Sequence, residues 1–225
     1  MTRKAVPLTG AEVDRLPASC RACLFWEDGI TGASVSPVKR ERREEPEARK
    51  RAWVEARVDE GSPPGRVLIV DGEVAGYALF APAGCFAPRS SLLPRVSVDA
   101  LLLATLWVPQ ARRGAGLGRL LVQTAIKEAI RLDLAAVEAY GDRRWSERAC
   151  VLPATWLLHE GFEIEHEHPR TPLLRLETRR TLRWAESLEH AWEEVLARLP
   201  RPVATPGTDP VPGGLPVPNS RATPR

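Results

Sequence analysis

The chain of 225 residues contains no apolar run that approaches the roughly 20 residues of a membrane-spanning helix, so we expect no membrane segment. Its first residues lack the long apolar core of a signal peptide, and the whole chain has only four cysteines. So few cysteines at this length indicate a reducing cytoplasm rather than a disulfide scaffold. The net charge is only +3, with both signs interspersed, which gives no support to a nucleic-acid partner.

Length and proline content divide the chain into a folded part and a tail. We expect residues 1–199 to form one domain, with a core at 66–177 and a C-terminal helix at 184–199. Apolar side chains spaced by three and four predict that helix, which packs on a sheet or, alternatively, on a second copy of the chain in a homodimer. In residues 200–225 proline recurs and apolar residues are too sparse to offset the entropy of ordering, which predicts a disordered tail.

The most informative stretch is 99–132. Residues 99–108 form an apolar block typical of a buried strand, and an amphipathic helix is predicted to begin at Arg119. Between strand and helix lie two arginines and three glycines at alternate positions, Arg112, Arg113, Gly114, Gly116 and Gly118. Alternate glycines permit a tight turn and let a ligand approach the backbone N–H groups, which attract anionic oxygens at a helix N-terminus. The stretch therefore predicts a phosphate-binding turn.

Two common nucleotide-binding motifs do not fit this turn. A Walker loop has lysine after its last glycine, whereas Arg119 follows Gly118 here. A dinucleotide-binding fingerprint counted from Gly114 would need a glycine where Arg119 stands. The run Arg113-Gly114-Ala115-Gly116-Leu117-Gly118, preceded by Val108-Pro109, instead resembles the acyl-CoA-binding motif Arg/Gln-x-x-Gly-x-Gly/Ala of the GNAT acetyltransferase superfamily.

The resemblance covers roughly residues 67–177 and implies an α/β fold. Its central sheet would be mixed, mainly antiparallel and splayed near the middle, with helices on its faces. Cys20-x-x-Cys23-x-Phe-Trp-Glu and the later Glu138-Ala-Tyr-Gly resemble an actinobacterial-type subgroup of the same superfamily.

The activity that the resemblance implies is N-acetyl transfer. An acetyl or other short acyl group would pass from acetyl-CoA to a primary amine by direct attack within a ternary complex. The acceptor stays open among a polyamine, an aminoglycoside, an amino acid and a protein amine. The alternative is a non-catalytic module of the same fold that binds CoA without turnover.

The resemblance also implies the residues that would hold acetyl-CoA, the co-substrate. Backbone N–H groups and arginines would bind the pyrophosphate, and the end of the preceding strand would bind the pantetheine arm. These residues are Leu106, Trp107, Val108, Arg112, Arg113, Gly114, Ala115, Gly116, Leu117, Gly118 and Arg119.

The catalytic residues are less clearly indicated. Related enzymes commonly carry a tyrosine as general acid four residues before a Gly-Phe pair, a position that Leu157 occupies here. The nearby substitutes are Tyr140 and Cys150, with His159 a less favoured one, and each has an alternative interpretation as a packing or solvated residue.

Glu138 is the candidate general base. A carboxylate within the apolar strand predicted at 136–140 must either be buried with a partner, such as an arginine, or face a polar cleft. Burial would raise its pKa toward neutrality and make it a better base. Asp99 could alternatively orient the amine.

Cys20 and Cys23 have the spacing of half a zinc site, and His166 and His168 could complete it. A metal-stapled interaction protein would then be the rival to an enzyme. The simpler interpretation is two small residues beside an apolar strand at 20–27, and we expect no metal.

The rest of the chain is predicted to form short helices and strands separated by loops. A hairpin at 66–80 with a two-residue Asp71-Gly72 turn is the strongest local signal. The other predicted elements are a helix start at Ser36-Pro37, a helix at 47–58, a loop at 82–96, a short helix opened by Pro153, a half-buried strand at 162–168 and a last strand at 172–177.

Overall fold

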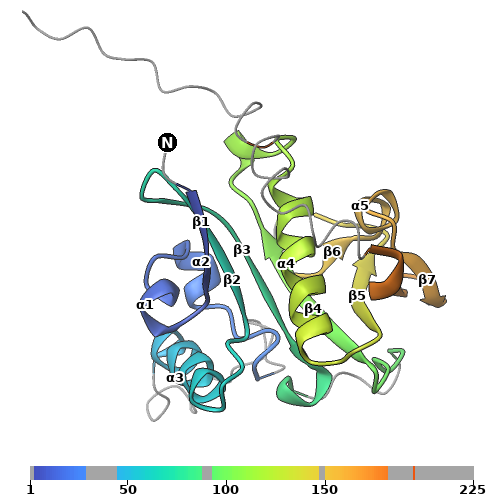
Figure 1. The fold of residues 1–225 in the computed structure, drawn as a ribbon, viewed down its shortest axis with the longest axis horizontal. Helices are drawn as coiled ribbons and strands as arrows, with labels where there is room; N and C mark the ends of the chain where they lie inside the picture. The colour runs from blue at the N-terminus through green and yellow to red at the C-terminus, as the bar shows by residue number, and fades with distance from the viewer. Residues whose placement is uncertain (1–2, 29–44, 88–92, 147–149, 182–194, 196–225) are drawn as a thin grey trace, which may run out of the picture.

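The computed structural model describes residues 3–28, 45–87, 93–146, 150–181 and Val195, and in this part of the chain one sheet dominates (Figure 1). Its strands follow the order β1-β2-β3-β4-β5-β8-β7, with the short β6 paired to β5. The strands are β1 (Arg3–Pro7), β2 (Gly65–Val70), β3 (Glu73–Pro82), β4 (Ala100–Trp107), β5 (Ala136–Asp142), β6 (Leu152–Pro153), β7 (Glu163–His166) and β8 (Leu173–Glu177). Neighbours run antiparallel except at β4–β5 and β5–β6, so the predicted mixed, mainly antiparallel sheet is confirmed.

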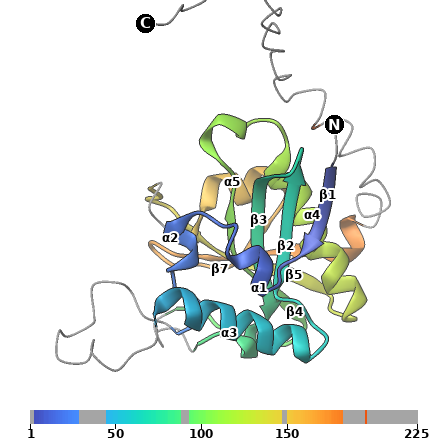
Figure 2. The same ribbon diagram turned by 90° about the vertical axis from the view of Figure 1, so that its left-hand side faces the viewer.

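Helices cover both faces of this sheet. The helix α4 (Leu117–Arg131) lies on one face, and α1 (Gly10–Val13), α2 (Ala18–Arg21) and α3 (Pro46–Asp59) gather on the other (Figures 1 and 2). The short α5 (Ala154–His159) follows β6. Within the described residues no helix combines the length and apolarity needed to cross a membrane.

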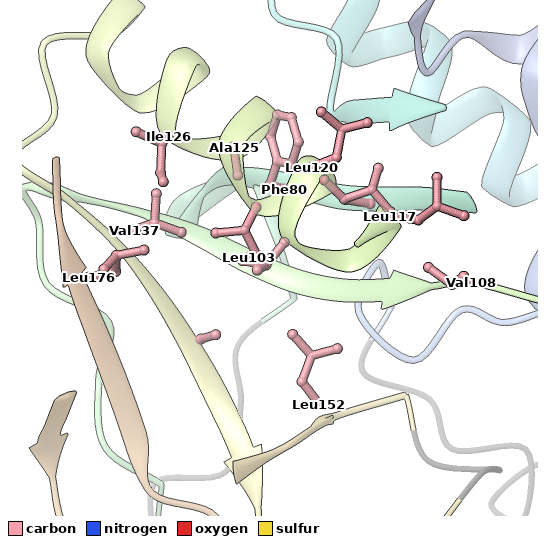
Figure 3. Packing of buried hydrophobic residues seen from close by; sticks show 14 of the residues in the cluster. Phe80, Leu103, Val108, Leu117, Leu120, Ala125, Ile126, Val137, Leu152 and Leu176 are labelled. Atoms are coloured by element: carbon pink, nitrogen blue, oxygen red, sulfur yellow. The ribbon is translucent and has the colours of Figure 1, made fainter. Parts of the chain in front are cut away.

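Two apolar cores result, one on each face. Under α4, Leu120 lies beside Phe80 and Ile126 lies over Val137 of the sheet, as Figure 3 shows. Under α1–α3 the second core holds Trp26, Val54, Tyr77, Leu79 and Leu102. Burial of both sheet faces explains why β4 is apolar without interruption.

The sheet opens at its centre, between β4 and β5. The two strands pair only where Ala100–Leu102 faces Ala136–Glu138. Beyond that point β4 pairs with β3, whereas β5 pairs with β8 and, at its end, with β6. On β4 an extra residue, Ala104, interrupts the register with β3, because Leu79 faces Thr105 while Phe80 faces Leu103. Such a bulge bends its strand. Among the described residues, the edge of β4 beyond Leu102 therefore has no strand partner on the β5 side.

Several sequence predictions need correction. The predicted strand at 20–27 is wrong, because α2 and a following turn occupy this segment. The strand predicted at 162–168 forms as β7, but all four of its residues are exposed rather than alternately buried. The N-terminal strand β1, absent from the sequence predictions, pairs with β2 at the sheet edge.

Other predictions agree with the structure or lie outside it. The hairpin forms as β2 and β3, the helix predicted at 47–58 forms as α3, and α4 begins two residues before Arg119. The helix start at Ser36-Pro37 and the tail at 200–225 lie outside the described residues. So does the helix at 184–199 except for Val195, which is buried in the core beneath α4.

Candidate active site

A cavity of about 350 Å³ lies where β4 and β5 part. Its walls come from the end of β4, the turn before α4, the segment around β6, and α5. Most of the residues predicted to hold acetyl-CoA line it, namely Leu106, Trp107, Val108, Arg112, Arg113, Gly114, Leu117 and Gly118. Three of the predicted residues, Ala115, Gly116 and Arg119, do not line it.

One end of the cavity is a turn rich in free backbone donors. Gly114 and Gly116 adopt φ values of 79° and 90°, a left-handed conformation that glycine tolerates best. The N–H of Leu120 closes the first turn of α4 on the Gly116 carbonyl at 3.1 Å. Among the described residues, no backbone–backbone hydrogen bond is donated by the N–H groups of 114–118. These groups, at a helix N-terminus, can receive anionic oxygens.

Arg112 places a buried side-chain donor beside the cavity. Its Nη1 atom is buried, yet it has no hydrogen-bond partner in the part of the chain that the structure describes. A buried donor without a partner is costly, and an anion in the cavity would satisfy it. The neighbouring Arg113 donates its Nε to the Val108 carbonyl at 3.3 Å, and Arg119 pairs with Glu160 at 2.8 Å.

The other walls of the cavity are apolar and aromatic. Trp145, Trp156 and the segment Val151–Pro153 line them. The Trp156 ring packs against the start of α4, because a Cβ atom added at Gly118 would lie 2.9 Å from its Cζ2 atom. This wall could not be predicted from the sequence, since it depends on β6 pairing with β5.

Glu138 does not line the cavity. Its side chain is fully buried, with Oε1 accepting from Arg175 Nη1 at 2.8 Å and Oε2 accepting from the Ser97 N–H at 2.9 Å. Of the two environments predicted for this carboxylate, a buried site with an arginine partner or a polar cleft, the structure shows the first. Both oxygens are engaged in holding β5 to β8 and to the segment before β4, so we do not propose Glu138 as the general base.

The other candidates also lie away from the cavity lining. Tyr140 donates its hydroxyl to the Pro94 carbonyl and stacks on Trp26 in the second core. Cys150 precedes the cavity wall and has its Sγ 3.2 Å from Cys23 Sγ. Asp99 is paired with Arg175, which lowers the pKa of its carboxyl.

The position usually held by a tyrosine offers no acid. Leu157 is fully buried in the core, and His159 is exposed beside Glu160. Among the described residues that line the cavity, the only ionisable side chains are arginines. Nor does the described part of the chain contain a group of His, Cys, Asp and Glu side chains arranged to hold a metal ion.

A splayed α/β sheet that opens toward a turn with free backbone N–H groups is typical of CoA-dependent acetyltransferases. The family model for the acetyltransferase (GNAT) family matches residues 31–150, more than half of the chain, and the chain belongs to this family. The predicted family membership is therefore confirmed, while the narrower subgroup stays a prediction. No curated protein sequence matches the chain.

Several solved structures share the fold. A PaiA N-acetyltransferase from Thermoplasma acidophilum, in complex with coenzyme A, is 12% identical with a TM-score of 0.52, over 79% of this chain and 99% of that one. An N-acetyltransferase from Staphylococcus aureus Mu50 is 17% identical with a TM-score of 0.50, over 79% and 99%. YncA, a putative acetyltransferase from Salmonella typhimurium with its cofactor acetyl-CoA, is 18% identical with a TM-score of 0.50, over 78% and 94%. At these identities the likeness shows the fold alone.

Replacing Arg112 by alanine is expected to weaken acetyl-CoA binding by about 10- to 100-fold. One charge-assisted hydrogen bond to a phosphate is worth roughly 1.5–3 kcal/mol, and about 1.4 kcal/mol corresponds to a factor of ten. Isothermal titration calorimetry measures the affinity. The matched control is Arg131→Ala at the far end of α4, where the arginine is half-exposed and pairs with Glu128. Equal affinities for the two variants would remove Arg112 from the site.

Proposed function

We propose that this protein transfers an acetyl, or other short acyl, group from acetyl-CoA to a primary amine. The observation that carries the proposal is the cavity in the split sheet, which ends at the free N–H groups of 114–118 and the unpaired Nη1 of Arg112. The fold supports it as well, because two of the similar structures hold coenzyme A or acetyl-CoA.

Each part of acetyl-CoA has a matching part of the cavity. The pyrophosphate would accept hydrogen bonds from the turn at 114–118 and from Arg112. The pantetheine arm carries amide groups, and it would lie along the β4 edge at Leu106–Val108. There it would take the place of the strand partner that β4 lacks beyond Leu102.

Transfer would occur directly from the thioester to the amine. No serine, cysteine, lysine or other nucleophilic side chain is among the described residues that line the cavity, which gives no support to an acyl-enzyme intermediate. The amine nitrogen would attack the thioester carbon, the C–S bond would break, and the CoA thiolate would leave. Neither a carboxylate nor a histidine lines the described cavity to take the amine proton, so the neutral amine would enter from solution and pass its proton to water.

The pH dependence of catalysis is therefore expected to follow the pKa of the acceptor. A peptide α-amine has a pKa of about 8 and an alkylamine such as the lysine side chain about 10.4. We expect kcat/KM to level off at a pH about 2 units lower for the first acceptor than for the second. Thiol release measured from pH 6 to pH 11 with both acceptors tests this, with acetyl-CoA affinity measured at each pH as the control. A bend at one shared pH below 8 would instead reveal a basic group of the protein.

The second candidate is a module that binds CoA without turnover. The lack of ionisable side chains other than arginine in the described cavity lining favours this alternative. Thiol release with a panel of amines distinguishes the two. Amine-dependent release supports the enzyme, whereas tight acetyl-CoA binding with no release for any amine supports the binding module.

A further inference from the structure

Two cysteines far apart in the sequence meet beside the cavity. The Sγ atoms of Cys23 and Cys150 lie 3.2 Å apart across a sequence separation of 127 residues. Cys23 follows α2 in the layer of N-terminal helices, and Cys150 directly precedes the cavity wall at Val151–Pro153. No motif of the GNAT site includes either residue, so the acetyltransferase function leaves their contact unexplained.

Buried side chains fix the backbone of both cysteines. Lys50, itself buried and ion-paired with Glu27, donates its Nζ to the Cys23 carbonyl at 3.0 Å. Trp26 donates its indole N–H to the Cys150 carbonyl at 3.2 Å. The backbones of both cysteines are therefore held by buried side chains of the surrounding core.

The two thiols differ in their readiness to lose a proton. The hydrogen bond from Cys150 lowers the pKa of Cys23 to about 6, against the opposing effect of burial, and the nearby Lys50 ammonium lowers it further. The same contact and burial raise the pKa of Cys150. The lowered pKa favours the thiolate of Cys23, which is the reactive form of cysteine, with the Cys150 thiol in hydrogen-bonding contact.

We propose that Cys23 and Cys150 are a site of reversible oxidation, at which a hydroperoxide converts the two thiols into a disulfide. The Cys23 thiolate attacks one oxygen of the peroxide, the O–O bond breaks, and Cys23 becomes a sulfenic acid while water leaves after protonation. The Cys150 sulfur then attacks the Cys23 sulfur, the S–O bond breaks, and a second water leaves. Two thiols lose two electrons and two protons in total, and one hydrogen peroxide is reduced to two waters.

This bond would tie the wall of the cavity to the helical layer. It closes a loop of about 127 residues, and closing so long a loop restricts the unfolded chain strongly. Formation of the disulfide does not depend on acetyl transfer, so the proposal stands or falls separately from the function proposed above.

The test uses the full chain, first reduced and then exposed to hydrogen peroxide at pH 7. We expect free thiols to fall from four to two, and digestion without reductant to yield a cross-linked peptide pair containing Cys23 and Cys150 in the mass spectrum. The melting temperature should rise by several degrees, and dithiothreitol should reverse all three changes.

Variants identify the pair. Cys85→Ser, which changes a cysteine outside the contact, should still form the cross-link, whereas Cys150→Ser should form none. In Cys150→Ser the oxidised Cys23 should instead be trapped by dimedone as a sulfenic acid. A cross-link between Cys20 and Cys23 in the unaltered chain, or four free thiols after peroxide treatment, would overturn the proposal.

Discussion

Replacing Gly118 by alanine is expected to weaken acetyl-CoA binding by about 10- to 100-fold while leaving the fold intact, although the family motif admits alanine at this position. The new methyl group would lie 2.9 Å from Cζ2 of Trp156, so the indole would have to shift and the cavity that both residues line would change shape. Overpacking of this kind costs about 1–3 kcal/mol, and the part of that cost that falls on the bound protein alone lowers the affinity by at most about 100-fold. The helix itself should gain stability, because alanine is favoured over glycine within a helix by about 1 kcal/mol. Calorimetric titration with acetyl-CoA and a thermal melt measure the two effects separately.

The matched control is Gly84→Ala. Gly84 lies in the short 3-10 turn Ala83–Cys85, where an added Cβ atom meets nothing within 4 Å and the backbone φ is not left-handed. This variant makes the same chemical change away from the cavity, and its acetyl-CoA affinity should equal that of the parent. If Gly118→Ala also bound acetyl-CoA with unchanged affinity, a shift of the Trp156 ring would not affect the space that acetyl-CoA occupies.

The part of the site that could be predicted from the sequence is the part encoded by neighbouring residues. Alternate glycines at 114, 116 and 118, an apolar strand before them and an amphipathic helix after them lie within one short stretch. Their geometry follows from local rules, since glycine supplies the left-handed turn and helix periodicity places the apolar face on the sheet. The strand β4, the turn at 114–118 and the helix α4 therefore agree with the prediction.

The opposite wall of the cavity could not be predicted, because it depends on how distant segments pair. Trp145 and Trp156 reach the cavity only because β6 pairs with β5 after the sheet has split.

The segment 20–27 is a second case in which tertiary packing overrides the local sequence pattern. Its aromatic residues read as a strand, yet Trp26 contacts Phe25, Phe86 and Tyr140 from a turn that packs between the helices and the sheet. Aromatic content alone does not distinguish a strand from a turn buried by tertiary packing.

Glu138 illustrates how a correct local inference can leave the role of a residue open. The sequence requires that a carboxylate in an apolar strand have either a partner or a polar cleft. Which of the two environments Glu138 has depends on the register of β5 against β8, and this register brings Arg175 opposite Glu138. Because the pairing residue lies 37 positions away, no pattern within the strand could identify it.

Arg175→Met is expected to destabilise the protein by about 3–5 kcal/mol. Arg175 donates to Glu138, Asp99 and Glu177, and of these three only Glu138 is fully buried. Removing the guanidinium leaves an uncompensated charge in the interior, whereas the exposed carboxylates remain solvated. Urea denaturation measures the free energy of unfolding. The matched control is Glu177→Gln, which removes a half-exposed partner of the same arginine and should cost no more than about 1 kcal/mol.

The double variant Arg175→Met with Glu138→Gln decides between a structural and a catalytic role for Glu138. If Arg175→Met destabilises the protein because it leaves the buried Glu138 carboxylate unpaired, neutralising Glu138 should recover part of the lost free energy of unfolding. The expected coupling energy between the two substitutions is roughly 1–3 kcal/mol. The single variant Glu138→Gln should likewise unfold at lower urea concentration, yet its folded fraction should bind acetyl-CoA and turn over as the parent does. A large loss of turnover at unchanged stability would contradict this expectation, because it would mean that the buried carboxylate takes part in proton transfer despite lying outside the described lining of the cavity.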